Sequence, residues 1–163
     1  MKRLTIVMSV MALLVIGAAP ALSQGPHENF RTHLSGENEV PAVDTQAQGQ
    51  AIFQLSADGE SLDYKLIVAN IENVIMAHIH IGDPNENGPV AVWLYPEDGP
   101  PPVLIEGRTQ GVLAEGTITE DDLTGPLEGA SMDDLMDAIR AGNTYVNVHT
   151  TQNMGGEVRG QIR

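Results

Sequence analysis

Polar and apolar residues alternate along most of the chain, in short runs separated by glycine, proline, aspartate or asparagine. Successive side chains of a strand point to opposite sides, so each alternating run predicts a strand with one apolar face. The runs are 30–34, 50–55, 61–68, 74–81, 89–95, 112–118, 145–150 and 157–163. About eight short strands of this kind predict a mainly β protein, an antiparallel β-sandwich or Greek-key barrel.

One segment has helical instead of strand periodicity. Its apolar residues stand at spacings of three and four, which places them on one stripe of a helix. They are Met132, Leu135, Met136 and Ile139. Ser131 before them is a good N-cap, and Gly142 after them is a natural left-handed stop. The pattern predicts one short helix over 131–141, which covers one end of the sheets.

Residues 1–23 have the features of a secretory signal peptide. A basic start, Met1–Arg3, precedes an apolar run over 4–17, and the small residues Ala21 and Ser23 stand before a suitable cut. The apolar run is shorter than the ~20 residues that span a bilayer. We therefore expect an exported protein, located in the periplasm, at the cell surface or in the medium.

The rest of the chain has a length that suits one domain. We expect a flexible start over 24–29 and a single domain over 30–163, with no membrane span after signal cleavage. The chain contains no cysteine, which excludes disulfides, thiolate metal sites and a cysteine nucleophile.

Acidic residues outnumber basic ones by 22 to 8, which gives the chain a formal net charge of −14. Such a surface repels nucleic acid and anionic lipid, so we expect neither as a partner. It attracts cations and basic partners. The charge also suits an acidic surface or matrix protein that binds cations loosely.

The candidate chemistry lies in three histidines on strand-like runs. His78 and His80 are two residues apart, so their side chains lie on the same face of a strand. His149 ends a second run, and in both runs the opposite face is aliphatic. If the two strands are neighbours, the three imidazoles converge on the outer face of the sandwich. Three imidazoles suit a copper or zinc ion, and His33 is a candidate fourth ligand.

Two other interpretations of the histidines are open. They can form a histidine–carboxylate or histidine–backbone network, for instance with Glu157, that fixes a strand crossing without any metal. They can also lie at a surface that contacts a partner.

Several motifs occur in an order that resembles a known family. They are LSGENEVPAV at 34–43, AHIHIG at 77–82, NGPV at 87–90, AGNTYVNVHT at 141–150 and GEVRGQI at 156–162. This order resembles the CHRD domain, which is repeated in the animal protein chordin and found singly in exported microbial proteins. The resemblance implies no established activity, and the growth-factor-binding modules of chordin are not present in this sequence.

From these observations we expect a non-enzymatic binding module whose partner is an extracellular protein or a cell-envelope component. The alternative is a small copper- or zinc-binding protein with a redox role. The histidine pair is similar in one respect to the copper site of copper–zinc superoxide dismutase. However, no histidine lies between His80 and His149 and no disulfide can form, so dismutase activity is not expected.

Overall fold

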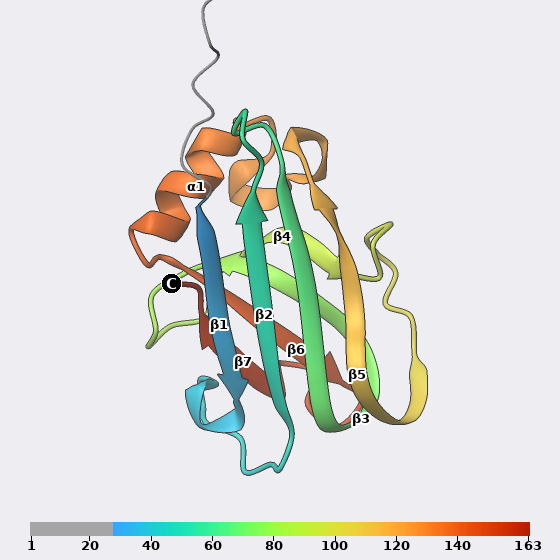
Figure 1. The fold of residues 1–163 in the computed structure, drawn as a ribbon. Coiled ribbons are helices and arrows are strands. Elements are labelled where there is room, and N and C mark those ends of the chain that lie inside the picture. The colour runs from blue at the N-terminus through green and yellow to red at the C-terminus, as the bar shows by residue number, and fades with distance from the viewer. Residues whose placement is uncertain (1–27) are drawn as a thin grey trace, which may run out of the picture.

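Seven antiparallel strands and one α-helix form the fold in the computed structural model, which describes residues 28–163 (Figure 1). The strands are β1 (Asn29–Ser35), β2 (Gln48–Leu55), β3 (Leu62–Ile81), β4 (Val90–Tyr95), β5 (Ile105–Ile118), β6 (Thr144–Thr150) and β7 (Val158–Gln161). Helix α1 spans Met132–Arg140, and short 3-10 turns occupy Gly36–Asn38, Glu120–Asp122 and Gly125–Leu127. Within the described range, no helix is long and apolar enough to cross a membrane.

The predicted signal peptide (1–23) and residues 24–27 of the predicted flexible start lie outside the described residues. The last two residues of that start, Glu28 and Asn29, lie within the described residues and contact the domain. The Glu28 carbonyl accepts a hydrogen bond of 2.9 Å from the Leu55 amide, and the Glu28 carboxylate pairs with Arg140. Asn29 is already the first residue of β1.

The strands close into a flattened barrel. β1 pairs with β2, β2 with β3, β3 with β6 and β6 with β7, and β7 returns to β1 at the Ser35–Arg159 pair. β4 and β5 each add to β3. The predicted β-sandwich or barrel with one helix is confirmed. The predicted strands 61–68 and 74–81 are the two halves of the single strand β3.

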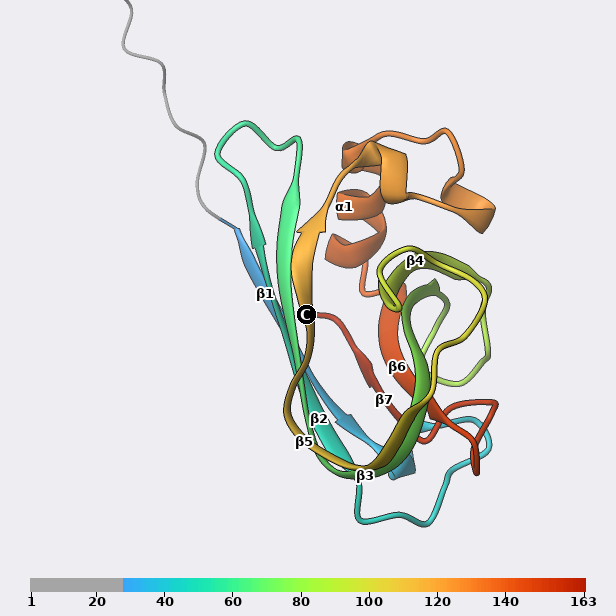
Figure 2. The same ribbon diagram turned by 90° about the vertical axis from the view of Figure 1, so that its right-hand side faces the viewer.

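β3 belongs to both layers of the barrel. Its first half pairs with β2 and β5, and its second half pairs with β4 and β6. Between the halves, Asn70 and Asn73 have φ angles of 57° and 55°, a conformation that asparagine tolerates better than most residues. The pairing with β5 shifts register at these positions, and Figure 2 shows the strand bending there from one layer into the other.

The core lies between the layers, where alternate residues of the strands meet. Leu66, Ile79 and Val146 have no exposed surface. Helix α1 closes one end of the barrel (Figure 2), and its apolar stripe is buried as the spacing predicts. Its N-terminus carries a capping box, in which the Ser131 hydroxyl accepts from the Asp134 amide.

Candidate functional site

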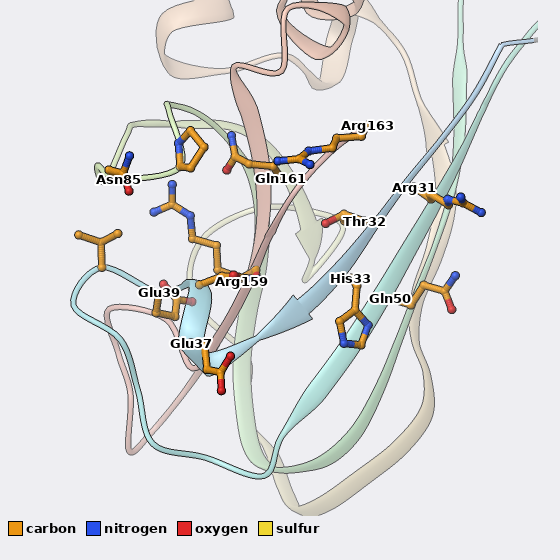
Figure 3. A pocket seen from close by; sticks show the side chains of 13 residues that line it. Arg31, Thr32, His33, Glu37, Glu39, Gln50, Asn85, Arg159, Gln161 and Arg163 are labelled. Atoms are coloured by element: carbon orange, nitrogen blue, oxygen red, sulfur yellow. The ribbon is translucent and has the colours of Figure 1, made fainter.

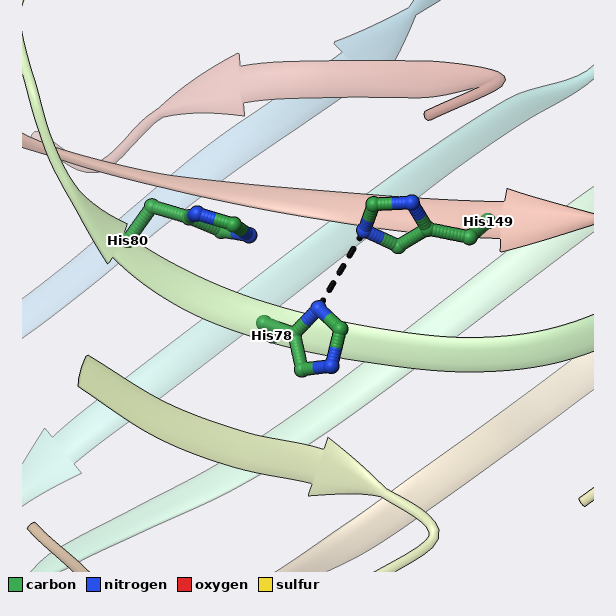
Figure 4. Close-up of side chains that lie close together, drawn as sticks. All are labelled: His78, His80 and His149. Atoms are coloured by element: carbon green, nitrogen blue, oxygen red, sulfur yellow. Dashed lines mark hydrogen bonds between the residues drawn. The ribbon is translucent and has the colours of Figure 1, made fainter. Parts of the chain in front are cut away.

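The three predicted site histidines lie together on one face of two neighbouring strands. β3 and β6 are antiparallel partners, so the conditional expectation that the imidazoles converge is met (Figure 4). One ring nitrogen from each of the three histidines can be chosen so that the three atoms lie within 4.8 Å of one another. The register pairs Met76 with His149, His78 with Asn147 and His80 with Tyr145.

The histidines face away from the core but are not at the surface. Their relative exposure is 2% for His78, 7% for His80 and 5% for His149. The loops after β3 and β6 contact two of them through backbone carbonyls, since Nδ1 of His80 lies 2.8 Å from the Gly88 oxygen and Nδ1 of His149 lies 2.9 Å from the Met154 oxygen. The rings thus point to the outer side of the two strands as expected, but they are covered, and buried rings do not form a contact surface for a protein partner.

The carbonyl contacts decide which nitrogen carries the proton. A carbonyl oxygen only accepts, so Nδ1 of His80 and Nδ1 of His149 are the protonated atoms in the neutral rings. The lone pairs of both Nε2 atoms are therefore directed away from these carbonyls. Nε2 of His80 has no hydrogen-bond partner among the described residues. Nε2 of His149 lies 3.2 Å from Nδ1 of His78 and 2.9 Å from Oδ1 of Asn147.

The cluster has more acceptors than donors. Neutral His149 has one proton for two oxygen acceptors, so in either tautomer one of its nitrogen lone pairs faces an oxygen. Nδ1 of His78 can donate to His149, but Nε2 of His78 is then buried without a partner. Turning the amide of Asn147 would give His149 a donor and would still leave Nε2 of His78 unpaired. A cation among the lone pairs would relieve this deficit at His80 and His149, and only Nε2 of His78 would stay without a partner.

Burial keeps the imidazoles neutral. It lowers the pKa of His78 to about 3, with smaller contributions from His149 and His80. It also lowers the pKa of His149 to about 4, and the pKa of His80 lies below its ordinary value for the same reason. At neutral pH all three rings therefore have the uncharged form that binds metals.

The spacing is close to that of a coordinated ion. Copper and zinc lie about 2.0–2.1 Å from an imidazole nitrogen, so two ligand nitrogens lie about 3–4 Å apart. The 3.2 Å between Nδ1 of His78 and Nε2 of His149 falls in that range. The widest ring separation is the 6.2 Å between the centroids of His80 and His149, so His80 must turn inward by a small amount to share one ion.

Further side-chain contacts hold the ring of His80 in place. Its ring stacks on Tyr145 at 4.7 Å with an angle of 5° between the planes, and the guanidinium of Arg159 covers Tyr145 at 3.4 Å from the ring centroid. The Tyr145 hydroxyl accepts from the Gly88 amide, the residue whose carbonyl binds His80. Such outer contacts orient metal-binding histidines.

Arg159 fixes the loop that covers the cluster. It is 1% exposed and donates to the carbonyls of Asp83 and Glu86 and to Oδ1 of Asn87. The alternation along β6 placed Tyr145 beside His149 on one face, but nothing local shows that an arginine from β7 reaches this loop.

Two sequence-based expectations fail at this site. His33 is exposed on β1 and is not in the histidine group, because β7 lies between β1 and β6 in the sheet. Glu157 does not bind a histidine. Its carboxylate accepts from the hydroxyls of Thr45 and Thr150 at 2.8 and 2.7 Å.

The sequence model of the CHRD domain matches residues 30–162, nearly all of the described chain. The chain therefore belongs to the CHRD domain family. Searches among curated proteins and among solved structures give no significant match.

Proposed function

We propose that this chain is an exported, non-enzymatic CHRD-domain binding module, and that its ligand is one copper or zinc ion held by His78, His80 and His149. One observation carries the metal assignment. Backbone carbonyls bind Nδ1 of two of the histidines, so that in each of them the lone pair is on Nε2, the atom that would bind an ion. Metal-binding histidines are typically oriented in this way.

A purely structural network explains the same residues less well. Such a network would pair the buried ring nitrogens with donors or acceptors. In this cluster Nε2 of His78 and Nε2 of His80 are buried and have no partner. Each unpaired group costs about 1–3 kcal/mol. A bound ion would take the lone pair of Nε2 of His80 and offset the cost there. It would also bind Nδ1 of His78.

The surroundings of the cluster support a binding role over a catalytic one. The rings nearest to it are Trp93, 4.2 Å from His78, and Tyr145. The acidic surface raises the local concentration of cations. The N-terminal sequence supports a location in the periplasm, at the cell surface or in the medium, where an extracellular protein or a cell-envelope component would be the partner.

Metal titration tests the proposal. Metal-free protein is titrated with Zn²⁺ and with Cu²⁺ against a competing chelator of known affinity. We expect one ion per chain and an affinity at least about a hundredfold lower in His80→Ala, since loss of even an outer contact costs 10–100-fold. His33→Ala is the matched control and should bind like the wild type. Equal uptake by a variant lacking all three histidines would contradict the proposal.

The exported state has its own test. Expression with the full N-terminus, followed by intact-mass measurement of the protein from the extracytoplasmic fraction, should give a chain that begins near Gln24. A full-length chain retained in the cytoplasm would contradict export and would leave the metal site unaffected.

A further inference from the structure

The histidine group supplies no negative charge to a bound ion. Its ligand atoms are ring nitrogens of His78, His80 and His149, and no aspartate or glutamate joins them within the described residues. Asn147, opposite His78 on β6, adds a further polar side chain to the group, with Oδ1 at 2.9 Å from Nε2 of His149. Its amide is neutral as well. An ion in this site therefore keeps its full charge.

The fixed charge that acts on the group is positive. Burial lowers the pKa of His80 and the charge of Arg159 lowers it further, whereas no carboxylate is among the groups that shift the pKa of any of the three histidines. The guanidinium of Arg159 has no carboxylate within 4.0 Å among residues 28–163. Figure 3 shows Glu39 beside the Arg159 side chain, but burial raises the pKa of this glutamate to about 7, so much of it is uncharged at neutral pH.

Burial makes the size of the ion's charge decisive. The three rings are at most 7% exposed, and Trp93 packs on His78 as Tyr145 does on His80. The free energy needed to move an ion from water into such a site rises with the square of its charge, so it is about four times as large for a divalent ion as for a monovalent one. Three-histidine zinc sites keep a water molecule as a fourth ligand, whereas covered rings leave little access for water.

A soft donor also stands on this face of the strands. Met76 precedes His78 by two residues and pairs with His149 in the register, which places it on the same face as the histidines. Residues directly opposite in an antiparallel pair have Cβ atoms about 4.5–5.5 Å apart. Thioether sulfur is a soft ligand that favours Cu(I).

We propose that the site selects monovalent copper, Cu(I), over Cu²⁺ and Zn²⁺. This inference rests on the proposed function, because it concerns the ion that the same three histidines bind. Neutral ligands, a neighbouring positive charge and exclusion of water each disfavour a divalent ion more than Cu(I). Cu(I) is also stable with three ligands, so it needs no water in a fourth position.

Affinities measured for each ion test the proposal. Cu(I) is titrated anaerobically with ascorbate against a Cu(I) chelator of known affinity, and Cu²⁺ and Zn²⁺ are titrated separately against chelators of their own. We expect Cu(I) to bind at least about a hundredfold more tightly than Cu²⁺, which raises the potential of the bound copper by ~120 mV relative to the free ions. Zn²⁺ should also bind more weakly than Cu(I). Binding of Cu²⁺ or Zn²⁺ as tightly as Cu(I) would overturn the proposal.

Asn147→Asp tests the physical cause. The substitution keeps the shape of the side chain and puts a carboxylate beside Nε2 of His149. We expect the preference for Cu(I) over Zn²⁺ to fall at least about tenfold, which corresponds to ~1.4 kcal/mol. Gln50→Glu adds the same charge at an exposed position of β2 and should leave the preference unchanged. An unchanged preference in folded Asn147→Asp would overturn the proposal, and the wild-type affinities decide it if this variant does not fold.

The outcomes separate this inference from the proposed function. One Zn²⁺ or Cu²⁺ per chain, bound as tightly as Cu(I) and lost in His80→Ala, would support the histidine metal site and overturn the selection of Cu(I). Failure of the histidines to bind any of the three ions would contradict both.

Discussion

The two halves of β3 have the same alternating pattern but very different surroundings. In the first half, Asp63 and Lys65 face water opposite the core residue Leu66, and Lys65 pairs with Glu115 at the surface. In the second half, His78 and His80 take the equivalent polar positions and are buried, His78 against Trp93 of β4 and His80 under the loop after β3. Water satisfies exposed polar groups, whereas buried ones need a partner from the protein or a ligand. Under the proposed function, this difference makes the second half the binding region.

The inner faces of the two halves should be equally important for stability. Leu66 and Ile79 have no exposed surface, so Leu66→Ala and Ile79→Ala each leave a cavity in the core. We expect each variant to lose about 2–5 kcal/mol of unfolding free energy, measured by denaturant titration. A loss below about 1 kcal/mol at Ile79 alone would show that the second layer does not unfold together with the first.

The outer faces should differ in their response to metal. At an ion concentration of about a hundred times Kd, binding adds about 2.7 kcal/mol to the unfolding free energy. We expect this gain for the wild type and for Lys65→Ala, and its loss in His78→Ala and His80→Ala. Chelator should remove the gain, as measured by thermal unfolding. An equal gain in His80→Ala would contradict a role for the covered histidines.

Burial of Glu39, which follows the turn after β1, should also give a pH dependence that the exposed half of β3 lacks. Burial raises the pKa of Glu39 from 4.5 to about 7 in the folded protein. The folded state therefore holds this proton more tightly, and its stabilising contribution is complete below pH 4.5 and is lost as the pH rises through 7. Relative to Glu39→Gln, the wild type should lose about 3 kcal/mol over this range. Parallel stability curves for the two proteins would contradict this prediction.

The smallest effect is expected at the exposed pair of the first half. The side chains of Lys65 and Glu115 are 42% and 58% exposed. Exposed pairs of this kind contribute little, so Lys65→Ala should change the unfolding free energy by no more than about 0.5 kcal/mol, and the change should shrink with added salt. A loss above about 1.5 kcal/mol would show that the outer face of the first half is more than a solvated surface.

The parts of the fold that depend on local geometry could be predicted from the sequence. Alternation placed His78 and His80 on one face, and the apolar stripe with Ser131 as a cap predicted helix α1. The continuity of β3 could not be predicted. It depends on Asn70 and Asn73 adopting a left-handed conformation within a strand instead of ending it.

The environment of the site depends on contacts far apart in the chain. Arg159 reaches the carbonyls of Asp83 and Glu86, and this contact holds the loop that covers His80. The failure of His33 as a ligand has the same origin, because the position of β1 beside β7 is a property of the closed barrel. The local pattern of residues indicates neither the contact of Arg159 with the loop nor the position of β1 beside β7.

X-ray absorption at the metal edge of the zinc- or copper-loaded protein tests the central claim most directly. With one ion per chain, the account predicts three imidazole nitrogens at about 2.0–2.1 Å, and a lower nitrogen count in His80→Ala. A spectrum with oxygen ligands only, unchanged by His80→Ala, would place the ion on the acidic surface and contradict the account.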